Sequence, residues 1–404
     1  MKWGWQIGWI GGLGLARLLG QELAPAVRSW ADASSGPASR AHRQAPAIPL
    51  PSREAVVLGY QEVYLASGLV PVEWIGNRTN CTAGTTSAAY ATATVQRLNF
   101  FRFLAGLPEP VSLNPAWSLQ CQEAALMISA QRQISHAPAP GWACYTAAGA
   151  EAAGRSNLAL GVAGPAAIDF YFDDPGTGNA AVGHRRWLLY PPLPSVGTGS
   201  LPAVGGVAAN ALWVIGLPGP RPAEPAWIAW PPPGFIPYRL LPVNSKRWSF
   251  SLPNADFSGA VVSMNRGGVA VPVTLEVPTS GYGDNTLVWV ASGVSPAAPV
   301  DDVTYLVTVG NVRVEGVART FTYEVTVIDP AHVVPAPVLA VRVEGLAVML
   351  TWPGSATGYT LQRALELGDV PTWQNVSSGP ELLGNEWRVT LGESWLPEYF
   401  RLKR

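Results

Sequence analysis

Residues 156–199 read SNLALGVAGPAAIDFYFDDPGTGNAAVGHRRWLLYPPLPSVGTG, and they indicate the fold class of the first half of the chain. Pro165 opens an apolar run, which predicts a short helix over 165–174 because proline is favoured in the first helical turn. The segments 196–199 and 211–215 lie between glycine and proline turns and are predicted to be strands. We therefore expect helices packed against a sheet in one α+β domain.

Three more helices are expected before Pro165. Residues 86–105 carry apolar side chains at helical spacing, and a glycine and a proline end the pattern. Asn114 followed by Pro115 is typical of an N-cap and first helical residue, and the helix that follows has a broad apolar stripe. A shorter helix is expected over 149–160.

The last part of the chain has the pattern of two all-β modules. A proline-rich stretch at 217–242 marks a boundary, and short apolar segments then recur at regular spacing, which is typical of a β-sandwich. The region 240–330 looks like an immunoglobulin-like sandwich, and the region 338–404, after a second proline-rich linker, resembles a fibronectin type III-like module. The strands expected in the first module lie at 248–252, 260–264, 271–275, 287–290, 305–309 and 321–327. The tryptophans of the second module are expected either in its core or stacked on sugars, and they are Trp352, Trp373, Trp387 and Trp395.

The composition excludes several classes of protein. Charged residues make up 13% of the 404 residues and the net charge is −1, so the basic excess needed to bind nucleic acid is absent. The hydrophobic share of 48% is too high for a mostly disordered chain. No run after the N-terminal segment approaches the ~20 apolar residues of a membrane helix, so we expect no transmembrane segment in the mature chain.

The N-terminus predicts export. Residues 1–24 combine an early Lys2, an apolar glycine-rich stretch and a small residue at Ala24, which is typical of a secretory signal peptide. The alternative is a membrane-anchoring helix. Residues 25–55 are rich in alanine, serine, proline and arginine and are expected to be a linker. The protein is therefore expected to be secreted, into the extracellular space or the periplasm.

The three cysteines divide into two kinds. Cys121 lies on the apolar stripe of its helix and is expected to be a buried free thiol. Cys81 and Cys144 lie in loop-like segments, so they are the better candidates for a disulfide in an oxidising compartment. The alternative use of a cysteine, as a nucleophile beside a histidine, lacks an orienting Asn or Asp.

Four segments of the first domain, taken in order, carry a family resemblance. They are RLNFFR at 97–102, AL at 125–126 with ISH at 134–136, SNLALG at 156–161, and YFDD at 171–174 with GHRRW at 183–187, followed by VGTG at 196–199. Together they resemble a CAP domain, from the superfamily of cysteine-rich secretory, antigen 5 and pathogenesis-related 1 proteins, also called SCP-like. The resemblance covers about 90–215 and implies an α-β-α sandwich, which we expect over 56–230.

The resemblance also implies a central cleft in which two histidines and two acidic residues can bind a divalent metal. By position, the histidines are His136 and His184, and the second acidic residue is Asp174. The first acidic position falls on Ser156, and Glu151 is the nearest carboxylate upstream. This departure from the family pattern lowers the expected metal affinity. Zinc is the cofactor that His136, His184 and Asp174 would hold, and no other cofactor is expected.

The residues around the two histidines support such a cleft independently. His136 precedes an Ala-Pro pair, where a helix cannot continue, and His184 lies between a glycine and two arginines. At such loop edges imidazoles can face a cavity and hold zinc or act as acid/base groups; alternatively, both bond to the backbone and brace the fold. Arg185 and Arg186 either bind an anion or anchor acidic side chains, for which the candidates are Asp169, Asp173 and Asp174.

These features lead to three functional hypotheses. The first is a secreted, non-enzymatic binding protein whose cleft takes a lipid or sterol, a glycan or a protein at the cell surface; lipid or sterol binding is what the resemblance implies. The second is a metal-dependent hydrolase or peptidase that uses His136, His184 and Asp174. The third is a structural or adhesion protein of the cell surface, in which the β modules position the first domain.

Overall fold

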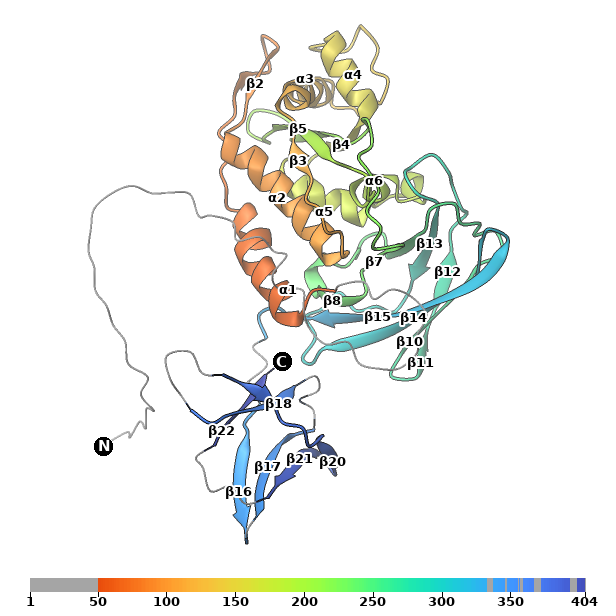
Figure 1. Cartoon of the computed structure of the whole chain (residues 1–404). Helices are drawn as coiled ribbons and strands as arrows, with labels where there is room; N and C mark the ends of the chain where they lie inside the picture. Colours follow the sequence, from red (N-terminus) through yellow and green to blue (C-terminus); the bar gives the residue numbers. More distant parts are fainter. Residues whose placement is uncertain are drawn as a thin grey trace, which may run out of the picture.

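The computed structural model describes residues 50–332, 337–345, 347–354, 356, 359–366, 372–392 and 398–403. The predicted signal peptide at 1–24, most of the predicted linker at 25–55 and Trp395 lie outside the described residues. Within the described ranges, no helix is both long and apolar enough to cross a membrane. An α+β region comes first and an all-β region follows it (Figure 1).

The α+β region has three layers around one sheet. The sheet has four strands, in the order β3 (Ser112–Leu113), β5 (Ser195–Leu201), β6 (Ala209–Trp213) and β4 (Ser156–Leu160). The pair β3–β5 is parallel, and the other two pairs are antiparallel. Figure 1 shows the helices on its two sides: α3 (Pro115–Gln131) and α4 (Ala147–Arg155) on one, α2 (Ala88–Leu104) and α5 (Pro165–Asp173) on the other. The expected α-β-α arrangement is therefore present.

The strand sequences explain why both faces are covered. Leu158 lies in the core under α3 and α4, and its neighbour Ala159 lies in the core on the α2 and α5 side. Side chains of a strand alternate between faces, so a strand with apolar residues on both faces must be covered on both. Gly197 and Gly199 of β5 allow α3 to lie directly on the sheet, because a Cβ at either position would collide with the backbone of that helix.

Several local predictions can be checked against these elements. The helix expected from Pro165 is α5, and Asn114 caps α3 by accepting the backbone N–H of Trp117 at 3.1 Å. The helix expected over 149–160 is wrong in its second half. It ends at Arg155, and the remaining residues form β4, since a short buried apolar run has no periodicity that separates helix from strand.

The first region also contains several shorter helices and a hairpin. Before α2 come α1 (Arg53–Gly59), the π-helical segment Tyr60–Leu65 and the hairpin β1 (Ile75–Asn77) and β2 (Thr82–Thr85). The helix α6 (Gly183–Leu188) follows the 3-10 turn Thr177–Asn179. Cys81, at the tip of the hairpin, is bonded to Cys144, which confirms the predicted disulfide. Cys121 is the free, buried cysteine, as predicted.

Two sheets after the α+β region enclose a common core. The larger has the order β11 (Val269–Val271), β10 (Val261–Arg266), β14 (Val303–Val314), β15 (Val317–Ile328) and β8 (Gly234–Pro237); the smaller has β12 (Val273–Leu275), β13 (Thr286–Ala291), β9 (Arg247–Ser251) and β7 (Ile228–Trp230). All pairs are antiparallel except β15–β8. The strand expected at 271–275 is split between the two sheets at Pro272, which has no backbone N–H to donate to a ladder.

The first region and these two sheets share one hydrophobic core. Trp230 is fully buried, and its ring lies 5.3 Å from that of Phe101 in α2 and 4.8 Å from that of Phe172 in α5. Residues 228–230, expected at the end of the first domain, pair with β9 instead. The proline-rich stretch at 217–242 thus supplies two strands and the 3-10 turn Tyr238–Leu240, so it joins the two regions tightly.

The final module has a separate, small core. One sheet has the order β16 (Ala340–Glu344), β17 (Ala347–Pro353), β21 (Glu386–Leu391) and β20 (Glu381–Leu383), and the other has β19 (Gln374–Asn375), β18 (Thr360–Ala364) and β22 (Tyr399–Lys403). Trp352 lies in its core and Trp387 packs against it. Trp373 instead lies under the Arg401 guanidinium, 4.2 Å from ring centroid to guanidinium carbon.

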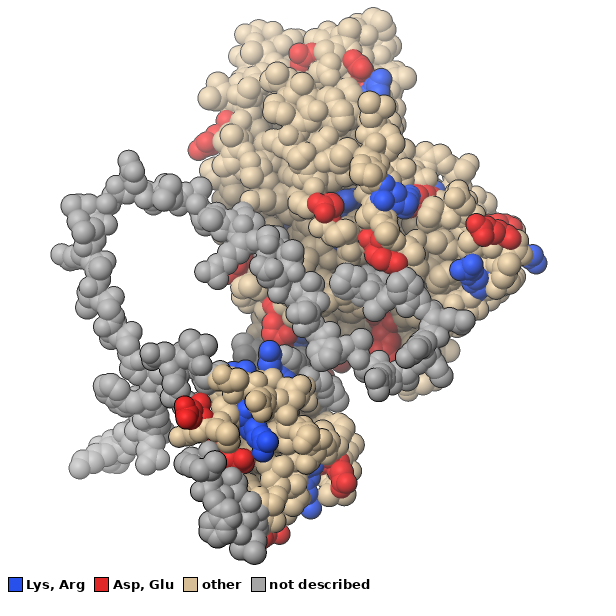
Figure 2. Space-filling model, viewed as in Figure 1, with Lys and Arg blue, Asp and Glu red and all other residues tan. Residues whose placement is uncertain are grey.

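Charged side chains are sparse on the face drawn in Figure 2, as the composition requires. Acidic and basic residues of the described ranges lie singly or in small mixed groups there, and no basic patch is visible among them. The helical part of this face is mostly uncharged.

Candidate functional site

The two histidines named from the sequence line one cavity of about 250 Å³. His136 comes from the loop after α3, and His184 lies in the first turn of α6. His136 therefore stands beyond the helix that it was expected to end, because Arg132 adopts a left-handed conformation and terminates α3. Ser156, at the start of β4, lines the same cavity.

Asp174 fixes the orientation of His184. The Asp174 carboxylate is fully buried; its Oδ1 lies 2.8 Å from His184 Nδ1, and its Oδ2 accepts the His184 backbone N–H at 3.0 Å. An ionised carboxylate only accepts hydrogen bonds, so Nδ1 carries the hydrogen and Nε2 is left for a ligand. The buried ring of Tyr171 stacks on the imidazole, with 5.4 Å between centroids.

The His136 ring is held in a similar way by the backbone. Its Nδ1 lies 2.9 Å from the carbonyl oxygen of Ala153 in α4, so Nδ1 donates there and Nε2 remains available. Only His136 makes the backbone bond of the second alternative, because Nδ1 of His184 bonds to the Asp174 carboxylate. Each ring makes a structural hydrogen bond through Nδ1, and each ring lines the cavity.

The two positions considered for the first acidic residue differ in placement. Ser156 is buried, and its Oγ lies 3.7 Å from the Cys121 Sγ. Burial raises the pKa of that thiol to about 12, so it is protonated at neutral pH. Glu151 lies on the exposed side of α4 and pairs with Arg155 at 3.5 Å, with about half of each side chain exposed. It does not line the cavity.

The donor set does not suit zinc. Protein zinc sites use three or four side-chain ligands. His136 and His184 offer one ring nitrogen each, while the Asp174 carboxylate is already taken up by His184. Among the residues that the structure describes, no group of three or more His, Cys, Asp or Glu side chains is placed to hold a metal ion. We therefore derive no chemistry through a metal.

Arg185 and Arg186 hold neighbouring segments through backbone carbonyls, and this differs from the expected pairing with carboxylates. Arg185 donates to Phe172 at 2.7 Å and to Arg247 at 2.8 Å. The last carbonyls of α5 lack partners within the helix, which is why a buried guanidinium is accommodated there. Burial lowers the pKa of Arg185 to about 10, so it stays charged at neutral pH. Of the three acidic candidates, Asp169 pairs with Arg97 at 2.7 Å.

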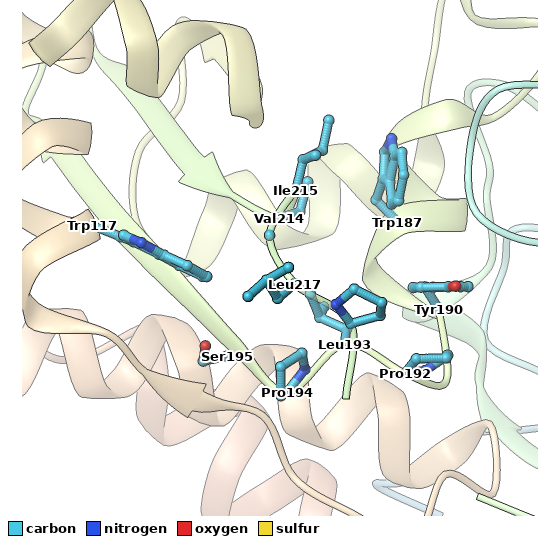
Figure 3. Close-up of a pocket in the computed structure, with 12 residues that line it drawn as sticks. Trp117, Trp187, Tyr190, Pro192, Leu193, Pro194, Ser195, Val214, Ile215 and Leu217 are labelled. Carbon is cyan, nitrogen blue, oxygen red and sulfur yellow. The ribbon is translucent and has the colours of Figure 1, made fainter. Parts of the chain in front are cut away.

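A second, mainly apolar groove adjoins the cavity (Figure 3). It measures about 200 Å³, and aromatic, proline and leucine side chains surround it, among them Trp117, Tyr190, Pro192, Leu193 and Leu217. Trp187, Val214 and Ile215 line both spaces, so the groove and the cavity are neighbours that share these three residues.

Sequence reasoning missed the groove and also one wall of the cavity. Gly281 and Tyr282, which line the cavity, belong to the loop between β12 and β13 in the all-β region. No local pattern links that loop to the histidines. The aromatic and proline residues at 187–194 were the available signal for the groove, because such residues gather at binding surfaces.

One comparison with known proteins identifies a family. Residues 95–214 match the family CAP, described as the cysteine-rich secretory protein family. The match takes in both histidines, Asp174 and Ser156, and it ends just before the groove residues Ile215 and Leu217. No curated protein matches the chain.

Proposed function

Residues 95–214 form a CAP domain, and we propose that it is a secreted, non-enzymatic binding module whose cleft takes an amphipathic lipid or sterol. The observation that carries the proposal is that the histidine-lined cavity and the apolar groove adjoin and share three lining residues. Trp187, Val214 and Ile215 belong to both. A ligand with one polar end and an apolar body fits such a pair of spaces better than a uniformly polar glycan does.

Each end of the cleft offers contacts suited to one end of that ligand. At the polar end, the oriented imidazoles of His136 and His184 can hydrogen-bond a hydroxyl or carboxyl group through Nε2. At the apolar end, Leu217 is 89% exposed beside Trp117 and Tyr190. Exposed apolar side chains that gather around a groove mark binding surfaces.

The disulfide supports the proposed location outside the cytoplasm. Disulfides persist in oxidising compartments and are rare where thiols are kept reduced. The Cys81–Cys144 bond therefore agrees with the export signal expected at 1–24.

Binding of dehydroergosterol, a fluorescent sterol excited by energy transfer from tryptophan, tests the proposal. Saturable binding is expected, and Leu217→Asp should weaken it by roughly tenfold or more, because a charge replaces an apolar side chain that the bound sterol would cover. Leu69→Asp is the matched control, since Leu69 is 84% exposed and lies outside the groove. Absence of saturable binding for both this sterol and a fluorescent fatty acid would overturn the proposal; displacement by cell-wall glycan fragments alone would favour a glycan ligand.

A hydrolase is the second candidate, favoured by the Asp174–His184 pair. A buried carboxylate that orients an imidazole is the arrangement that enzymes use to prepare a general base. Turnover of p-nitrophenyl esters or peptides by the wild type, lost in His184→Gln, would favour this candidate. Turnover that persists in His184→Gln would remove its physical basis.

A further inference from the structure

The polar cavity is completed by a segment that lies outside the CAP domain. Gly281 and Tyr282 of the β12–β13 loop line it together with the two histidines. The Tyr282 ring lies against Gly183, where an added Cβ would come within 2.8 Å of a ring carbon. An aromatic ring of the all-β region therefore covers the residue that immediately precedes His184.

One arginine of α6 holds this loop on both sides of Tyr282. The Arg186 guanidinium donates to the carbonyl oxygen of Thr279 at 2.8 Å and to that of Asp284 at 2.9 Å. Its central carbon lies 5.3 Å from the centroid of the Tyr282 ring. Arg186 is buried, so water competes little for these bonds. Since Arg186 and His184 belong to the same short helix, one element positions both the imidazole and the loop opposite it.

Tyr282 stands between two glycines of the loop. Gly281 and Gly283 flank it with φ of +98° and +58°, a left-handed conformation that glycine adopts without strain. Neither neighbour has a side chain, so the Tyr282 phenol is the large side chain that this turn places at the cavity. An ion pair between Arg221 and Asp284 adds a second anchor at the end of the loop.

We propose that Tyr282 is a selectivity-determining residue of the cleft: it contacts the polar end of the bound ligand and limits the width beside His184. The identity of the ligand rests on the proposed function, whereas the position of Tyr282 as a wall of the cavity does not. A phenol combines an apolar ring with a hydroxyl, so it suits a compact, hydroxyl-bearing end on a rigid apolar body. A bulky charged head group is excluded by the same ring.

The wall can be tested without any ligand. Diethyl pyrocarbonate reacts with accessible imidazoles, and Tyr282→Ala should raise the rate of His184 modification several-fold, measured by mass spectrometry. The exposed His332 serves as the internal reference, and Val277→Ala is the control variant in the same loop, because Val277 is 82% exposed and does not line the cavity. An unchanged rate at His184 in Tyr282→Ala would show that the ring does not shield it, which overturns the inference.

Sterol titration tests the contact with the ligand. Tyr282→Ala should weaken dehydroergosterol binding roughly three- to tenfold, the loss expected for one aromatic contact. Tyr282→Phe keeps the ring and loses only the hydroxyl, so it should lose less affinity than Tyr282→Ala. Wild-type affinity in Tyr282→Ala would overturn the selectivity role. If the wild type binds neither this sterol nor a fluorescent fatty acid, the proposed function fails, and the modification rate of His184 still decides whether Tyr282 forms a wall of the cavity.

Discussion

Asp174 and His184 are joined by two bonds across the segment between α5 and α6: Oδ1 lies 2.8 Å from Nδ1, and Oδ2 accepts the backbone N–H of the same histidine at 3.0 Å. Asp174 itself adopts a left-handed conformation with φ of 52° as the C-cap of α5. Asp174 thus ends α5 through its backbone, while its buried carboxylate accepts an N–H of the first turn of α6 and sets the tautomer of an imidazole in the cavity.

Two substitutions of Asp174 should distinguish the contribution of its side-chain volume to stability from that of its hydrogen bonds. Asp174→Ala leaves the His184 N–H without an acceptor. It also places alanine in a left-handed conformation, which alanine disfavours because it has no polar side chain to stabilise it. We therefore expect a loss of about 2–4 kcal/mol in the free energy of unfolding. Asp174→Asn keeps the volume, and asparagine tolerates this conformation, so it should lose less. Urea denaturation of both variants measures the difference, and equal losses would contradict the explanation.

A methyl group on β5 should push α3 away from the sheet. Gly199→Ala places a carbon against the backbone of Cys121 and Gln122, which cannot retreat as a flexible side chain could. We expect a loss of about 1–3 kcal/mol in unfolding free energy, the usual range for overpacking. Gly141→Ala is the control, because nothing lies within 4 Å of the added carbon. Equal melting temperatures for the two variants would show that α3 does not rest on this glycine.

The cysteines should give one thiol on unfolding. Unreduced, denatured protein is expected to react with one equivalent of Ellman's reagent, from Cys121, and the native protein with none, because that thiol is buried and its pKa is raised to about 12. Cys81→Ser together with Cys144→Ser should reduce the free energy of unfolding by roughly 2–4 kcal/mol through the lost cross-link. A count of three thiols before reduction would refute the bond.

Zinc should bind weakly at the two histidines. Isothermal titration of the wild type is expected to show no tight saturable site, since His136 and His184 supply only one free ring nitrogen each and Asp174 is engaged by His184. His136→Ala combined with His184→Ala is the control for any residual heat. Tight binding that disappears in this double variant would mean that a further ligand joins the two imidazoles, against the geometry of the cleft.

The amino-acid sequence by itself determined the features that depend on near neighbours along the chain. Pro165 starts α5 and Asn114 caps α3. Such signals are local because capping and turn formation involve residues a few positions apart. The order of the CAP motifs along the chain was likewise sufficient to predict a CAP domain, and residues 95–214 match that family.

Only the tertiary structure decided what surrounds the histidines. Ser156 begins a strand because β6 is there to pair with it, although its own sequence run also suits a helix. Arg186 finds carbonyl partners, and Tyr282 reaches the cavity, because the all-β region shares a core with the CAP domain around Trp230. Contacts between segments so far apart depend on how whole layers pack, and the pattern within any one segment carries no information about them.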